Sequence, residues 1–245
     1  ARAWKHRAFA ARARQLGWQR HAGDSEELHE LRQEIVPLIA RDDPALTAEA
    51  TRLADRWLAD RSGVPDDLAS AVLAVAAYHG DAARFDRYVA AARDARDRTE
   101  HARLLGALGD FADPALADRG LAMVLGHDLD LRDSVEIIDG VLALRETRDL
   151  GLAFLAEHID ELLARMRDDE ATGFLGAIAR PFCDPERRAQ VARLVVARAE
   201  KFDGAPARVA RSLEQSDQCI ARVQRELPAL RRVLGAPAPQ PSTPR

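Results

Sequence analysis

The chain has 245 residues, enough for one elongated domain or two compact ones, and 47% of them are hydrophobic. Only 5% are aromatic, so a core must be built mainly from Ala, Leu and Val. The formal net charge of −4 argues against a nucleic-acid-binding domain and against a polybasic membrane-surface role. No apolar run approaches the roughly 18 residues that a membrane-spanning helix needs, and the start shows no signal-peptide pattern.

Helical patterns fill the first half of the chain. Residues 1–17 are predicted to form a helix, and Ser25–Arg41 places apolar residues on one face behind a capping-box arrangement of Asp24 and Glu27. The pair Asp43-Pro44 combines an N-cap acid with a proline at the first helical position, which predicts the next helix start. Acid pairs at such starts are interpreted as partners of the helix dipole.

The second half repeats these patterns. Asp113-Pro114-Ala115-Leu116 copies Asp43-Pro44-Ala45-Leu46, and Asp184-Pro185 marks another helix start. A long apolar stripe from Val209 to Leu234 predicts a last helix that is packed along its whole length, with Pro228 expected to kink or restart it.

About a dozen helices of moderate length are therefore expected. Helices of this size bury their apolar faces by stacking in pairs. The sequence predicts an all-α fold, a HEAT/armadillo-like α-solenoid of paired antiparallel helices over residues 1–235. Residues 236–245 contain four prolines and are predicted to form a disordered tail.

Sequence motifs for chemistry are missing or incomplete. The pair His29-Glu30 begins like HExxH, but Gln33 stands where the second histidine would be. No two of the seven histidines lie three or four residues apart, so each is interpreted as a surface or helix-end residue. Cys183 and Cys219 form no CxxC pair and are interpreted as two ordinary half-buried thiols.

Arginines provide the candidate binding residues. Arg145 and Arg148 flank a predicted turn between two long helices, and arginine forks suit peptide carboxylates and acidic side chains. Arg187, Arg188 and Arg193 crowd another helix start. The alternative for both groups is a solvated face with local ion pairs.

The order of short marks along the chain is similar to that of a known family. The marks are Leu16-Gly17-Trp18, Leu31-Arg32, Trp57, Asp67-Leu68 with Val72, Leu104-Leu105 with Ala107-Leu108-Gly109, Asp113-Pro114, Leu131-Arg132-Asp133 and Phe154-Leu155 ahead of Leu162. The chain resembles the helical C-terminal domain of gluzincin zinc aminopeptidases of the aminopeptidase N type. The branch that includes the endoplasmic-reticulum antigen-trimming enzymes is the most similar.

The resemblance covers residues 1–235 and has departures. His158 stands where the family often has Asn, the last long helix lacks a common Trp, and the first helices of the family domain are expected to precede Ala1. The resemblance implies a curved helical stack that closes a peptide chamber over the catalytic domain of the same polypeptide and contacts the distal part of peptide substrates. It places zinc and every catalytic residue in that other domain, and no cofactor in this chain.

Three interpretations follow. The first is this accessory, chamber-closing domain, with Arg145 and Arg148 as candidate peptide contacts. The second is a free-standing helical-repeat scaffold that binds a protein partner. The third is a hydrolase in its own right, although the chain alone is expected to be inactive.

Overall fold

A computed structural model describes residues 2–126, 128–179 and 182–235, and these form twelve α-helices without a strand. The predicted disordered tail, 236–245, lies outside the described residues. Within these ranges no helix is long and apolar enough to cross a membrane. The helices are α1 (Arg2–Leu16), α2 (Glu26–Ala40), α3 (Pro44–Asp60), α4 (Asp66–Tyr78), α5 (Ala82–Asp94), α6 (Arg98–Leu108), α7 (Pro114–Leu125), α8 (Leu131–Ala143), α9 (Arg148–Ala164), α10 (Asp168–Ile178), α11 (Pro185–Ala199) and α12 (Ala205–Gly235).

The Asp-Pro pairs start helices as predicted. Asp43, Asp113 and Asp184 are the N-caps of α3, α7 and α11, and each carboxylate accepts at least one hydrogen bond from a backbone N–H group in the first turn. The following proline has no N–H to leave unsatisfied. These three starts are therefore fixed locally by the sequence.

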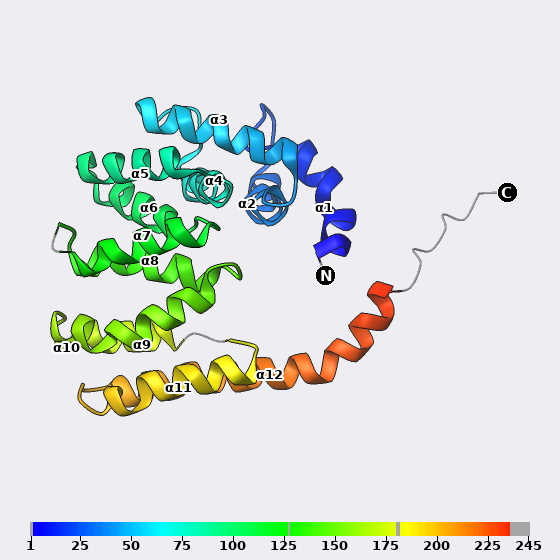
Figure 1. Cartoon of the computed structure of the whole chain (residues 1–245). Helices are drawn as coiled ribbons and strands as arrows, with labels where there is room; N and C mark the ends of the chain where they lie inside the picture. Colours follow the sequence, from blue (N-terminus) through cyan, green and yellow to red (C-terminus); the bar gives the residue numbers. More distant parts are fainter. Residues whose placement is uncertain (1, 127, 180–181, 236–245) are drawn as a thin grey trace.

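One prediction about a helix start needs correction, and the structure decides between the two alternatives predicted for Pro228. Ser25, and not Asp24, caps α2, because its hydroxyl accepts from the N–H of Leu28 while Asp24 binds the buried guanidinium of Arg32. The last helix does not restart at Pro228, since α12 continues from Ala205 to Gly235 with this proline inside it. Its second half does bend away from the line of the first (Figure 1).

The helices stack in pairs along a curve, which confirms the predicted helical-repeat fold (Figure 1). The even-numbered helices α2 to α12 contact one another in a continuous row, and odd-numbered helices pack against them. Because the row curves, the C-terminal end of α12 returns toward α1, and residues of both line one groove. We call the side that carries this groove the concave side.

The core is continuous and consists mainly of Ala, Leu and Val, as the composition predicts. Larger side chains occupy special places: the indole N–H of Trp18 donates to the carbonyl of Leu46 at 2.9 Å, and the hydroxyl of Tyr88 donates to that of Leu73 at 3.1 Å. The first bond connects the loop after α1 with α3, and the second connects α5 with α4, so they fix neighbours in the stack as well as satisfy buried polar atoms.

Candidate functional site

A groove of about 1040 Å³ occupies the concave side. Its walls come from α1, the end of α2, α4, the turn between α8 and α9, and the end of α12. Two of these walls belong to opposite ends of the described chain. The curvature of the stack, rather than any local motif, therefore creates the groove.

Exposed apolar side chains gather in this groove. Trp4 (44% exposed) and Leu38 line one side, and Leu230 and Val233 (68% exposed) line the other. Scattered exposed apolar residues are common on proteins, but four large ones around one groove indicate a binding surface. From the sequence, Leu38 and Leu230 were expected to lie on buried helix faces, so this cluster of exposed apolar side chains was not predicted.

A chain of polar contacts crosses one side of the groove. The guanidinium of Arg41 donates to Asp110 at 2.8 Å and lies over the ring of Tyr78, 5.1 Å from its centroid. The hydroxyl of Tyr78 in turn donates to Glu146 at 2.9 Å. Burial raises the pKa of Asp110, although Arg41 opposes that rise. This series of contacts holds α2, α4 and the α8–α9 turn in a fixed arrangement.

The structure separates the two predicted contact residues. Arg145 is exposed and lines the groove, whereas Arg148 is half-buried and does not line it. Arg148 donates to the carbonyls of Leu142 and Ala143, each at 2.9 Å, and lies over the ring of Phe182. Burial, followed by the charge of Arg187, lowers the pKa of Arg148. Arg148 therefore caps the end of α8 and supports the turn that carries Arg145.

The second arginine group forms local ion pairs. Arg187 binds Asp149 at 2.9 Å, and Arg188 binds Asp217 at 2.8 Å. These contacts tie α11 to α9 and α12, and they confirm the interpretation of a solvated face for these two arginines. Arg193 is exposed on the same helix.

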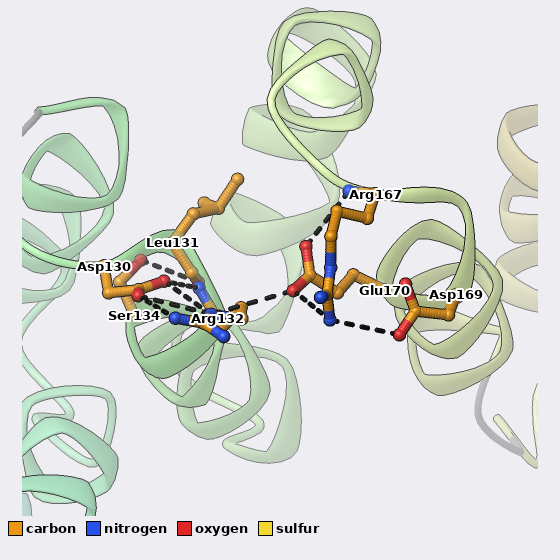
Figure 2. Close-up of polar contacts among 7 residues, drawn as sticks. All are labelled: Asp130, Leu131, Arg132, Ser134, Arg167, Asp169 and Glu170. Carbon is orange, nitrogen blue, oxygen red and sulfur yellow. Dashed lines mark hydrogen bonds and ion pairs between the residues drawn. The ribbon is translucent and has the colours of Figure 1, made fainter.

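Another ion-pair network connects α8 with α10 outside the groove (Figure 2). Arg132 binds Asp130 at 2.5 Å and reaches Glu170 at 3.7 Å, and Arg167 binds Glu170 at 3.0 Å. Hydrogen bonds from the side chain and backbone N–H of Arg132 lower the pKa of Asp130 to about 2. Because opposite charges satisfy one another here, the network stabilises two helix starts and offers no unused charge to a substrate.

The incomplete HExxH motif has a structural role. His29 is buried in the first turn of α2, and its Nε2 lies 2.6 Å from Asp67 Oδ2. Gln33 donates to the same carboxylate oxygen at 2.6 Å, so both residues fasten α2 to the start of α4. Across the described ranges no group of three or more His, Cys, Asp or Glu residues could hold a metal ion. The donor sets seen here do not fit a zinc site.

The interpretation of the two cysteines as free thiols is wrong. Cys183 and Cys219 form a disulfide, with their Cα atoms 5.1 Å apart. It joins the segment before α11 to the middle of α12. Their separation of 36 positions in the sequence carries no pairing signal, because only the packing of α12 beside that segment brings the two sulfurs together.

Comparison with known proteins identifies a family. The model of a family described as the ERAP1-like C-terminal domain matches residues 1–222. No curated protein matches the chain. The matched range includes the groove walls from α1, α2, α4 and the α8–α9 turn, while the wall at Leu230–Leu234 lies beyond it.

Proposed function

Because the chain belongs to the family of ERAP1-like C-terminal domains, we propose that it is the chamber-closing domain of an aminopeptidase. In this proposal its groove contacts the part of a peptide substrate that lies away from the N-terminus being removed. The catalytic domain of the same polypeptide supplies the hydrolysis. This chain supplies binding and enclosure.

The groove on the concave side carries the proposal. Pockets for small ligands have volumes of about 300–1,000 Å³, and this groove, with about 1040 Å³, is at or above the upper end of that range. Its apolar walls suit peptide side chains, while the exposed Arg145 along it offers positive charge to carboxylates. An extended peptide of several residues fits these features better than a single amino acid.

The proposal assigns no zinc site to this chain. The aminopeptidase resemblance implies a zinc ion that activates water for peptide hydrolysis, but the donor sets described above do not fit one. We therefore assign no hydrolytic step to any residue of this chain. The zinc ligands belong to the catalytic domain that the proposal requires.

The experiment measures peptide binding by the full 245-residue chain. A fluorescently labelled peptide of about ten residues with apolar side chains should bind, because several residues can fill the groove together, and a labelled dipeptide of the same composition should bind at least about tenfold more weakly. Fluorescence anisotropy gives both affinities. Equal affinities, or no binding of the longer peptide, would contradict the proposal.

A second test examines the gene. The coding sequence that continues upstream of Ala1 should encode an HExxH motif followed by a glutamate ligand, because the chamber needs a catalytic domain. A gene in which the same protein begins near Ala1 would favour the free-standing scaffold instead.

A further inference from the structure

The disulfide lies where the packed part of α12 ends. Ala205, Val209, Leu213 and Ser216 of α12 are buried, and in the described part of this helix no residue after Ser216 is buried. Cys219 follows this last buried position by less than one turn. The remaining residues, 220–234, lead to the groove wall at Leu230, Val233 and Leu234.

The partner segment of this disulfide connects with the opposite wall. Next to Cys183, the N–H of Phe182 donates to Ser216 Oγ at 3.2 Å, and the ring of Phe182 lies against the guanidinium of Arg148. Arg148 holds the carbonyls of Leu142 and Ala143, directly before the wall formed by Ala143–Glu146. One short segment, Phe182–Cys183, therefore fastens α12 to the support of the other wall.

We propose that the Cys183–Cys219 disulfide is a redox-controlled tether that holds the C-terminal part of α12 in place as a wall of the groove. Its reduction releases this wall and weakens peptide binding at the groove. The effect on peptide binding rests on the proposed function, whereas the effect on the position of α12 does not.

The reductant is a dithiol, and the disulfide is accessible to it, since Cys183 is exposed and Cys219 only half-buried. One thiolate of the dithiol attacks a protein sulfur, the S–S bond breaks, and a mixed disulfide forms. The second thiolate then displaces the protein sulfur. Two electrons and two protons pass to Cys183 and Cys219, which become thiols, and the dithiol becomes a disulfide.

Loss of the tether affects α12 more than the rest of the chain. A segment with few buried contacts and exposed backbone hydrogen bonds opens locally at low free-energy cost, and an isolated helix of about fifteen residues is marginal in water. Residues 220–234 meet this description once the cross-link is removed. The helices α3 to α6 pack chiefly against one another, α2 and α8, so we expect them not to depend on it.

Hydrogen exchange on the full chain tests the tether. We expect backbone amides in 217–234 to exchange at least about tenfold faster after reduction by a small dithiol, with no change in α3–α6. The variant C183S/C219S should exchange like the reduced protein and should not respond to the dithiol. If that variant fails to fold, the reduced wild-type chain with protected α3–α6 still gives the comparison.

Two results would overturn the tether: equal exchange of 217–234 in both redox states, or two free thiols in protein purified without reductant. Peptide binding measured on the same samples separates the two proposals. Faster exchange with weaker binding supports both. Faster exchange without peptide binding in either state supports the tether and counts against the proposed function.

Discussion

Neighbouring arginines in this chain have different roles because their surroundings differ. Arg145 and Arg148 lie three positions apart in the sequence, which made them equal candidates. The side chain of Arg148 satisfies two carbonyls at the end of α8, a place where cations are favourable because of the helix dipole. Arg145 extends into the groove. Arg145 can therefore contact a ligand directly, whereas Arg148 would first have to break its contacts with these carbonyl groups.

We predict separate effects for the two substitutions. Arg145→Ala should leave the free energy of unfolding within about 0.5 kcal/mol of the wild type, as exposed positions usually do, and should weaken peptide binding. Arg148→Ala should lower that free energy by about 1–3 kcal/mol, because hydrogen bonds from a charged group are lost. Urea unfolding and peptide anisotropy measure the two effects, with Arg193→Ala as an exposed control. A stability loss confined to Arg145→Ala would contradict this assignment.

The buried N-cap Asp43 predicts a dependence on pH. Burial tends to raise its pKa, but the guanidinium of Arg14 and the N–H groups of Leu46 and Ala45 outweigh burial and lower it. A carboxylate with a lowered pKa in the folded state adds stability above its unfolded pKa of about 3.9, and this stability is lost as the pH falls through the folded value. Asp43→Ala should therefore cost about 1–2 kcal/mol at neutral pH.

The measurement for Asp43 is urea unfolding as a function of pH. The difference between wild type and Asp43→Ala should shrink below about pH 4. Asp43→Asn keeps a capping oxygen without the charge, so it should lose less at neutral pH than Asp43→Ala. A difference that stays constant from neutral pH to pH 3 would show that the charge of Asp43 does not stabilise the fold.

At the scale of the elements, two glycines set the approach of α6 to α8. A Cβ atom added at Gly140 would lie 2.7 Å from the carbonyl carbon of Gly109 and 2.8 Å from its Cα atom. Both are backbone atoms that no side-chain rotation can move. The two helices meet closely only because neither residue has a side chain at this contact.

Gly140→Ala should destabilise the protein although alanine favours helix. Helix propensity alone would add about 1 kcal/mol, while the forced separation of α6 from α8 should cost about 1–3 kcal/mol. Gly106→Ala in α6 is the matched control, since a Cβ there meets nothing within 4 Å. Thermal unfolding should show a lower melting temperature for the first variant and an equal or higher one for the control. Equal gains for both would contradict the close contact.

Whole-molecule curvature decides which apolar residues are available for binding. Val233 and Val196 are both exposed valines on the last two helices, at 68% and 47%. Only Val233 lies in the groove. We predict that Val233→Ser weakens peptide binding, because apolar area is lost from the wall, and that Val196→Ser does not.

Anisotropy titrations of both serine variants give this comparison. Neither substitution should change the free energy of unfolding by more than about 0.5 kcal/mol, because both side chains are already exposed to water. If Val196→Ser weakened binding as much as Val233→Ser, the peptide would be bound outside the groove.

The sequence by itself determined the helices, most of their starts and the all-α repeat fold, because caps such as Asp43-Pro44 and the spacing of apolar residues act over a few neighbouring positions. It also indicated the family, through the order of short marks along the chain. The same local reasoning treated Leu230 as part of a buried face and Cys183 and Cys219 as thiols. Only the tertiary structure decided the groove, the disulfide and the different roles of Arg145 and Arg148. The groove depends on how far the stack of helices curves, and that curvature is the sum of many helix contacts that no short segment contains. The disulfide depends on the packing of α12 beside the segment before α11, and the role of Arg148 depends on the conformation of the α8–α9 turn.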